Sequence, residues 1–487
     1  MADAQALAEM RLESVKPRPK VAVLGGGPAG LGAAWRLSTE GKAAVDLFEA
    51  GPRVGGNAAS FEADGVMCDF GSHRLHPASD PKILADIKAL LGDDLLLRPR
   101  HGRIRLKDSW IHFPLKPIDL ATRLPTGFAA SLFIDAATAK LRAPKPEIET
   151  FGSVLLGGLG RTMCESFYFP YMKKLWGLGP DDLAPTLARR RVSGSSLPKL
   201  LAKILRSLPG LKSETTGKFY YPRRGFGAIS ERLAAAAREA GANIRLNARV
   251  EEIEIADNRV RSIEIKDGAA IERVKVDAVW STLPLTTLVR AAGNAAPASV
   301  RTAANAMRYR GMILVYLVLE TDQYTEFDAH YFPELSIPIS RLSEPKNYAA
   351  SAEPEGLTVL CAELPSDPGD AYWPMDDDAL GCALYAWLGA AGLPQSAKIK
   401  RAFTRRLPFA YPVYDRDFER RFATLDDWIS GVEGLLTFGR QGLFAHDNTH
   451  HALAMAYAAA DCLEAGVFDK TKWSRYREEF QTHVVED

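Results

Sequence analysis

The sequence has little cysteine and almost no net charge. Its five cysteines are Cys68, Cys164, Cys361, Cys382 and Cys462, and no two of them form a C-x-x-C pair. This scattered spacing argues against a zinc site or a disulfide framework and suits a reducing compartment. A net charge of +1 over 487 residues argues against a surface for nucleic acid or a polybasic membrane anchor.

Long apolar runs are also missing. The richest apolar stretch, residues 127–141, is broken by Asp135 and Lys140 and is too short to span a bilayer. Residues 1–20 are polar and charged and contain no apolar segment of the signal-peptide type, so we expect a flexible tail over residues 1–18. These absences predict a cytoplasmic protein without a membrane span.

A glycine-rich turn near the start of the chain carries the strongest signal. The apolar residues 21–24 lead directly into Gly25-x-Gly27-x-x-Gly30, and a helical pattern begins at Pro28 and Ala29. In a dinucleotide site the first glycine permits the tight turn, the second lets the backbone approach a pyrophosphate, and the third lets helix and strand pack closely. The helix N-terminus then offers N–H groups to the phosphates.

An acid follows at the distance that such a site requires. A second apolar run ends at Glu49, nineteen residues after Gly30, where a carboxylate would accept hydrogen bonds from a ribose. Directly afterwards come Ala50, Arg53 and the glycine pair Gly55-Gly56, followed by Asn57. This segment is either a plain turn or a second backbone approach to the cofactor with Arg53 near a phosphate or the adenine, and its position favours the second.

A histidine loop follows, with Gly71, Ser72, His73 and His76. Two histidines three residues apart suggest a metal, but no carboxylate or cysteine cluster accompanies them, so we predict no metal site. Two interpretations remain: a structural histidine, or a loop that runs past a flavin ring with His73 donating to it or polarising it.

In the middle of the chain the sequence pattern becomes mainly helical. Helical patterns cover residues 81–91, 118–124, 129–141 and 153–175, interrupted by a hairpin at 103–113. Aromatic residues are dense up to Trp176, where a helix end is expected to run into a mobile loop. Such density is usually core, but exposed aromatics of a loop would serve a ligand.

Strand patterns return after residue 218. A helix at 229–240, strands around Val250 with a hairpin at Asp257-Asn258, and an apolar run at 278–284 are expected to complete the nucleotide domain. Alternating residues at 309–363, with Arg341 among them, predict a separate antiparallel sheet, and a helix is expected at 376–391.

The last feature is Gly439-Arg440, which leads through Asn448 to a helix of small residues at 449–464. The strand and loop lead to a second helix N-terminus, whose N–H groups and positive dipole end can bind an anion. Because no second Gly-x-Gly-x-x-Gly occurs, we assign this segment to the same cofactor, which we take to be FAD. The residues expected to contact it are Gly25, Gly27, Pro28, Ala29, Gly30, Glu49, Ala50, Arg53, Gly55, Gly56, Asn57, Gly71, Ser72, His73, Val250, Gly439, Arg440 and Asn448.

We therefore predict an α/β protein whose Rossmann-like FAD-binding domain is assembled from separate segments. The expected parts of that domain are residues 19–80, 215–300 and 431–487. A mainly helical domain with the mobile loop is expected at 81–214, and an antiparallel β-sheet substrate domain at 301–430.

These motifs together resemble the FAD-binding superfamily of amine oxidases, protoporphyrinogen oxidase, carotenoid desaturases and UDP-galactopyranose mutase. The shared stretches are the Gly25–Gly30 motif, Glu49, Arg53-Val-Gly-Gly56, Arg249-Val250 and Phe438-Gly-Arg440. Four others look more like the mutase: the His73 loop, Lys174-Leu-Trp176-Gly177 with Asp181–Pro185, Ile337–Arg341, and residues 439–450. The likeness runs from about residue 20 to 464.

The mutase likeness implies roles for particular residues. Arg341 would hold a substrate diphosphate, His73 would stabilise the flavin, and both are the expected catalytic residues. Trp176, Tyr220, Tyr221 and Tyr414 would line the substrate cleft. Two departures bear on recognition: Leu178 stands where the mutase loop has an arginine, and His446 and Asp447 stand where it has tyrosines. The sugar nucleotide therefore need not be UDP-galactose.

The resemblance implies a redox-neutral isomerisation of a nucleotide sugar between pyranose and furanose forms, with nucleophilic attack by N5 of reduced flavin. It implies a nucleotide-sugar substrate and a reductant such as NAD(P)H or a reductase. The sequence leaves the oligomeric state open, with a homodimer as one option. The alternative is an oxidoreductase of the amine oxidase, protoporphyrinogen oxidase or desaturase type that uses oxidised flavin. A third, non-catalytic alternative is a flavin-binding partner in an envelope-polysaccharide assembly.

Overall fold

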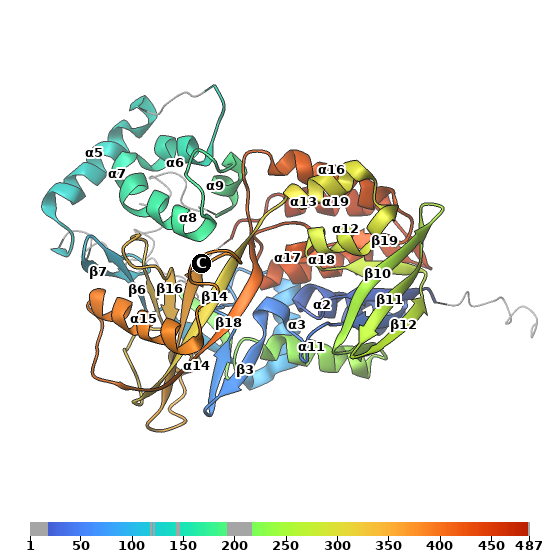
Figure 1. Cartoon of the computed structure of the whole chain (residues 1–487), viewed down its shortest axis with the longest axis horizontal. Helices are drawn as coiled ribbons and strands as arrows, with labels where there is room; N and C mark the ends of the chain where they lie inside the picture. The colour runs from blue at the N-terminus through green and yellow to red at the C-terminus, as the bar shows by residue number, and fades with distance from the viewer. Residues whose placement is uncertain (1–17, 117–118, 120–121, 143–146, 192–216, 486–487) are drawn as a thin grey trace, which may run out of the picture.

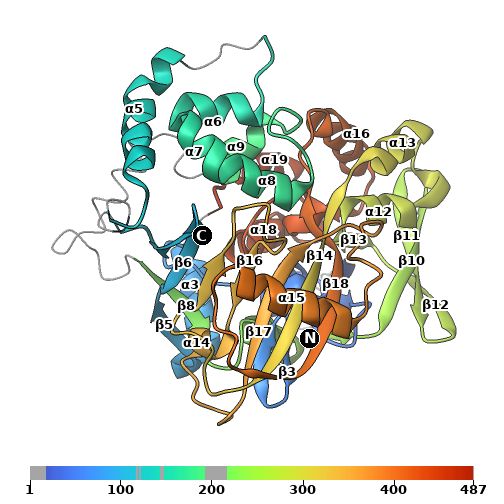
Figure 2. The same ribbon diagram turned by 60° about the vertical axis from the view of Figure 1, so that its left-hand side comes forward.

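A computed structural model describes residues 18–116, 119, 122–142, 147–191 and 217–485. Two β-sheets organise these residues, one parallel and one mainly antiparallel (Figure 1). A group of helices, α5 to α9, lies at one end beside β6 and β7, and Figure 2 shows the same arrangement from a second direction. The predicted α/β class is confirmed.

The parallel sheet is assembled from three distant parts of the chain. Its order is β19-β13-β1-β2-β9, and every neighbouring pair is parallel. The strands are β1 (Lys20–Leu24), β2 (Ala44–Phe48), β9 (Asn243–Arg245), β13 (Ala278–Ser281) and β19 (Leu435–Thr437). Four of the five residues of β1 are buried, as expected for a strand covered on both faces.

Helices with small residues pack closely on this sheet. They are α2 (Pro28–Thr39), α11 (Ala228–Glu239) and α18 (Thr449–Asp461). A Cβ added at Gly32 of α2 would lie 2.9 Å from Leu453 of α18 and 3.1 Å from Ala456. The predicted helices at 229–240 and 449–464 are therefore present, and the second ends at Asp461.

The second sheet has seven strands in the order β18-β14-β17-β16-β15-β6-β7, and all pairs except β15 with β6 are antiparallel. They are β6 (Gly102–Leu106), β7 (Ser109–Phe113), β14 (Tyr309–Glu320), β15 (Ala329–Tyr331), β16 (Arg341–Ser343), β17 (Thr358–Pro365) and β18 (Lys398–Pro412). The hairpin at 103–113 thus belongs to this sheet. The predicted helix at 376–391 is α15 (Asp377–Ala390), which packs against it.

Smaller sheets complete the fold. β10 (Ala248–Ala256), β11 (Arg259–Asp267) and β12 (Ala270–Lys275) form an antiparallel sheet. The predicted hairpin joins its first two strands, with φ of 52° at Asp257 and 58° at Asn258. The two-stranded sheets pair β3 (Ser60–Ala63) with β4 (Val66–Asp69), β5 (Leu95–Pro99) with β8 (Lys218–Pro222), and β20 (Leu463–Glu464) with β21 (Val467–Phe468).

The helical region differs from the expected pattern. It contains α5 (Thr126–Arg142), α6 (Phe151–Leu159), α7 (Arg161–Met163), η3 (Cys164–Tyr168), α8 (Phe169–Trp176) and α9 (Pro185–Arg191). The helix predicted over 153–175 is interrupted at Gly160, where φ is +80° and a Cβ would lie 2.6 Å from that of Asp135. The end of the predicted helical domain, residues 192–214, lies outside the described residues.

The other helices lie around the two sheets. α3 (Pro81–Leu91) shares a hydrophobic core with Val21 of β1 and Leu31 of α2, so it packs with the nucleotide domain and not with α5 to α9. The remaining helices are α12 (Leu285–Ala291), α13 (Ala298–Ala306), α14 (Pro345–Ala349), α16 (Phe418–Gly431), α17 (Gly439–Gly442) and α19 (Lys470–Phe480), with short 3-10 turns η1 (Gly56–Ala58), η2 (Gly92–Asp94) and η4 (Gly293–Ala295). Among the described residues, no helix has the length and apolar composition that crossing a membrane requires.

The close contact between β1 and α2 gives a testable prediction. A Cβ at Gly30 would lie 2.0 Å from the Gly25 carbonyl oxygen, whereas a Cβ at Gly27 would meet no atom within 4 Å. We expect Gly30→Ala to lower the free energy of unfolding of the apoprotein by at least about 2 kcal/mol in urea titrations. Gly27→Ala is the matched control and should leave apoprotein stability nearly unchanged. Equal stability of the two variants would contradict this packing.

Candidate cofactor and substrate site

A cavity of about 400 Å³ opens at the carboxyl ends of four parallel strands. Gly25 follows β1, Glu49 follows β2, Thr282 follows β13 and Arg440 follows β19, and all four line it. Ligands of open parallel sheets bind at this edge. The predicted site residues that line the cavity are Gly25, Gly27, Pro28, Ala29, Glu49, Gly56, Asn57, Gly71, Ser72, His73, Arg341, Arg440 and Asn448.

The N-terminus of α2 forms the phosphate end of the cavity. Gly27 is its N-cap and makes no side-chain capping bond, and Pro28 occupies the first helical position. The N–H groups of the first turn are therefore left for a ligand, as in anion sites at helix N-termini. Gly25 adopts φ of +101°, which a side chain would strain.

Glu49 is held in place by backbone donors. Its Oε2 accepts from the Gly26 N–H and its Oε1 from the Gly51 N–H, each at 2.7 Å. A carboxylate offers about four acceptor positions, so roughly two remain for hydroxyl groups. This geometry fits a ribose diol, which was the role expected from the sequence.

Six residues predicted to contact the cofactor do not line this cavity. One is Gly30, which packs α2 against β1. The other five are Ala50, Arg53, Gly55, Val250 and Gly439. Gly55 donates its N–H to the Gly26 carbonyl at 2.7 Å and so ties the second glycine pair to the first. Arg53 donates to the Ser60 carbonyl at 3.2 Å. The cofactor contacts of all five stay predictions.

Asp69 is a buried centre for the histidine loop, and the sequence did not reveal this role. Its carboxylate accepts from Ser60 Oγ at 2.5 Å, Tyr221 Oη at 2.7 Å and the Phe226 N–H at 2.9 Å. Burial raises the pKa of Asp69. These bonds fix the start of the loop that carries His73.

His73 is turned toward the backbone of its own loop. Its Nε2 donates to the Phe70 carbonyl at 3.0 Å, and its ring stacks on Phe226 at 5.2 Å between centroids. Burial lowers the pKa of His73. The ring is then neutral with its proton on Nε2, so Nδ1 acts as an acceptor.

Arg341 lies in a buried ion pair at the cavity wall. Its Nε and Nη2 donate to Glu363 Oε1 at 3.0 and 2.7 Å, and Nη2 also donates to the Ser72 carbonyl at 3.2 Å. The Ser72 N–H donates to the same carboxylate oxygen at 2.8 Å. Although burial opposes it, the Glu363 carboxylate raises the pKa of Arg341 well above its ordinary value. The pair therefore fixes the His73 loop.

Arg74, for which the sequence suggested no role, forms a parallel network. It donates to Asp328 Oδ1 at 3.1 Å, to Tyr331 Oη at 2.9 Å and to Tyr348 Oη at 3.0 Å. Ser72 Oγ and Tyr348 Oη are hydrogen-bonded as well. The cavity wall here carries hydroxyl groups with fixed orientations.

Two further arginines line the cavity beside Tyr411. The guanidinium of Arg440 lies 5.2 Å from the Tyr411 ring centre and that of Arg191 lies 5.6 Å from it. Arg440 donates to the carbonyls of Asp447 and Ala410 at 3.0 and 3.1 Å. Among the described residues neither arginine has an ion pair, and burial lowers the pKa of Arg440. Arg191 and Tyr411 were not identified from the sequence.

The aromatic residues predicted to line the substrate cleft are not brought to the cavity. Trp176 is fully buried and meets His446 edge-on at 5.6 Å. Tyr221 bonds to Asp69, and Tyr414 donates to the Phe444 carbonyl at 2.7 Å. Tyr220 pairs with Leu97 between β5 and β8. These four side chains are used in packing within the protein. The aromatic residues that line the cavity are Tyr171, Tyr331 and Tyr411.

Comparison with known proteins identifies the family of this sequence. A family model described as flavin-containing amine oxidoreductase matches residues 28–406, which is more than three quarters of the sequence. The chain belongs to this family. The family implies FAD, and the glycine cradle, the uncapped α2 N-terminus and Glu49 fit a dinucleotide at this edge.

Individual relatives are distant. The chain is 46% identical over 66 residues to tryptophan 2-monooxygenase of Agrobacterium vitis, and 34% identical over 125 residues to protoporphyrinogen oxidase 2 of Arabidopsis thaliana. These segments are 13% and 24% of this chain but only 9% and 23% of those proteins. The solved structure of reduced UDP-galactopyranose mutase is similar in fold, with a TM-score of 0.79, 20% identity, and coverage of 96% of this chain and 100% of that one.

The buried His446 gives a prediction for pH dependence. Burial first, and then Arg191 and Arg440, lower its pKa well below the ordinary value. A lowered pKa means that stability is present above pH 6.5 and is lost as the pH falls, because the unfolded chain binds the proton more readily. As the pH falls from 8 to 5, this group lowers the free energy of unfolding by about 2 kcal/mol. In urea titrations over this range, the free energy of unfolding of His446→Leu should therefore fall by about 2 kcal/mol less than that of the wild type. Equal falls in the two proteins would contradict the assignment.

Proposed function

We propose that the protein is a redox-neutral flavoenzyme that interconverts the pyranose and furanose forms of a nucleotide-linked sugar. The observation that carries the proposal is the pair of cavity arginines, Arg191 and Arg440, which flank Tyr411 without an ion pair among the described residues. Arg440 has the Asp447 carboxylate nearby as a negative charge, and Arg191 is half-buried. Two cations against one carboxylate leave an excess of positive charge at this wall, which favours an anionic ligand.

A diphosphate is suited to these two cations. Guanidinium groups bind phosphate oxygens in bidentate fashion, and a nucleoside diphosphate carries more than one negative charge. An alkylamine is a cation in water near pH 7, and these two arginines would repel it as it enters. Arg341 and Arg74 already have the carboxylates of Glu363 and Asp328, so they add less net charge to the cavity.

Two C–O bonds at the anomeric carbon break and two form. The bond to the diphosphate is cleaved and later made again. The ring C–O bond is exchanged for a C–O bond to another hydroxyl of the sugar, whose proton passes to the released ring oxygen, so no net electron transfer occurs. Reduced FAD, when bound, supplies an electron-rich ring that can act as the nucleophile. Arg191 and Arg440 hold the diphosphate before and after cleavage, and Ser72 and Tyr331, which line the cavity, orient the sugar hydroxyls.

The His73 loop forms the wall beside this ligand. The Arg341–Glu363 pair fixes Ser72, and the Asp69 centre fixes the start of the loop. In this proposal Arg341 mainly positions the loop, whereas the sequence suggested it as the diphosphate ligand. A physiological reductant such as NAD(P)H or a reductase keeps the flavin reduced.

The alternative is a net oxidation by oxidised FAD. The names of the curated relatives, a monooxygenase and an oxidase, support it. The fold similarity to the mutase supports the isomerase but does not exclude the oxidase, since the family shares this architecture.

The two functions are separated by incubating anaerobic, dithionite-reduced holoprotein with a panel of nucleotide sugars. The proposal expects an isomer of equal mass, flavin that stays reduced, and no conversion by oxidised protein. Failure of the reduced protein with every nucleotide sugar, together with oxygen consumption by the oxidised protein on an amine, would overturn it.

A matched pair of variants tests the anion site. Arg189 and Arg191 both lie on α9, but Arg189 is exposed and pairs with Glu149. We expect Arg191→Ala to weaken binding of UDP to the reduced holoprotein at least about tenfold, since a charged hydrogen bond is lost. Arg189→Ala removes the same charge and should change binding less than about twofold. Calorimetric titration with UDP and GDP measures both, and equal effects would contradict a local contact.

A further inference from the structure

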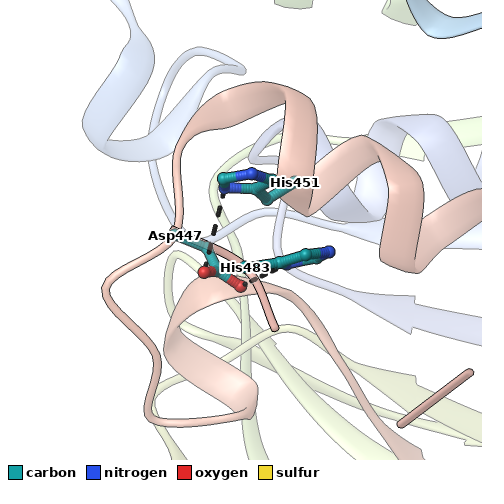
Figure 3. A group of neighbouring side chains, drawn as sticks. All are labelled: Asp447, His451 and His483. Atoms are coloured by element: carbon teal, nitrogen blue, oxygen red, sulfur yellow. Dashed lines mark hydrogen bonds and ion pairs between the residues drawn. The ribbon is translucent and has the colours of Figure 1, made fainter. Parts of the chain in front are cut away.

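Three potential metal ligands meet beside the cavity, at residues to which the proposed function assigns no role. They are Asp447 in the loop before α18, His451 in the first turn of α18, and His483 after α19 (Figure 3). The carboxylate oxygen and the two ring nitrogens all lie within 4.8 Å of one another. Segments from three elements thus converge on one point.

The spacing is close to that of a bound transition metal. His483 Nδ1 lies 3.2 Å from Asp447 Oδ2, and His451 Nδ1 lies 3.9 Å from Asp447 Oδ1. Ligand bonds of about 2.0–2.1 Å in tetrahedral geometry put neighbouring ligand atoms about 3.3 Å apart. The distance to His483 matches this value, and the distance from His451 to the other carboxylate oxygen is longer by about half an ångström. The third pair of ligand atoms, the two ring nitrogens, lies within 4.8 Å and must also draw closer.

Metal binding would replace two hydrogen bonds. The Asn448 N–H donates to His451 Nδ1 at 3.3 Å, so this nitrogen carries the lone pair that a metal would take over. His483 Nδ1, which bonds to Asp447 Oδ2 at 3.2 Å, would release its proton to the solvent. Asp447 is only 2% exposed, and its carboxylate has His483 as a hydrogen-bond partner and Arg440 as a nearby positive charge. A divalent cation would add positive charge directly at this buried carboxylate.

We propose that Asp447, His451 and His483 form a binding site for a divalent transition metal of the zinc class. Two imidazoles and one carboxylate are ligands that Zn²⁺ accepts, and three protein ligands leave one coordination position open. The bound ion links the segment after α19 to the first turn of α18. Because Asp447 also lines the cavity, the ion lies at the cavity wall.

The experiment uses holoprotein with no affinity tag, stripped with EDTA and titrated with ZnCl₂ in a calorimeter. We expect one Zn²⁺ per chain with a dissociation constant in the micromolar range or below. X-ray absorption of the loaded protein should give a first shell of nitrogen and oxygen at about 2.0–2.1 Å with imidazole scattering. Substoichiometric or millimolar binding would overturn the proposal and leave Asp447 and His483 as an ion pair.

Two variants make the test specific. His483→Asn removes one ligand and should weaken Zn²⁺ binding by about 100-fold or more. The matched control is His112→Asn, which removes the histidine of another histidine–carboxylate pair, with His112 Nδ1 2.5 Å from Asp119 Oδ2. The control should bind Zn²⁺ as the wild type does. Unchanged affinity in His483→Asn, with the flavin spectrum showing that the protein is folded, would equally overturn the site.

Discussion

The parallel pairing of β1 with both β2 and β13 is the interaction on which the rest of the structure depends. It brings residues from near the start and from the middle of the chain to one edge, where Gly25, Glu49 and Thr282 follow the three strands. β19 then adds to β13 and brings Arg440 to the same edge. Since parallel strands end on the same side, the cavity is a direct consequence of this pairing.

Charge is distributed unevenly around that cavity. Glu363 neutralises Arg341 and Asp328 neutralises Arg74, so both pairs serve to hold the wall in shape. Arg191 and Arg440 lack such partners among the described residues, and they share Tyr411. In the proposed function, the difference between paired and unpaired arginines separates the residues that hold the wall in shape from those that bind the anionic ligand.

The parts predictable from the sequence were local ones. The Gly25–Gly30 turn and Glu49 have roles fixed by spacing within one βαβ unit, and the hairpin at Asp257-Asn258 follows from turn chemistry. Tyr414 and Trp176 were assigned to the substrate because aromatic residues are equally suited to cores and clefts, and only tertiary packing decides. Arg191, Asp69 and His483 gave no signal, because their partners lie far away in the sequence.

The central claim is that the cavity holds a nucleotide sugar while its anomeric C–O bond breaks and re-forms. Positional isotope exchange measures this directly, with a nucleotide sugar carrying ¹⁸O in the bridge between the anomeric carbon and phosphorus. In the presence of reduced holoprotein the label should move into non-bridging phosphate positions, and oxidised holoprotein should leave it in the bridge. Retention of the bridging label during isomerisation, or no exchange with any nucleotide sugar, would contradict the account.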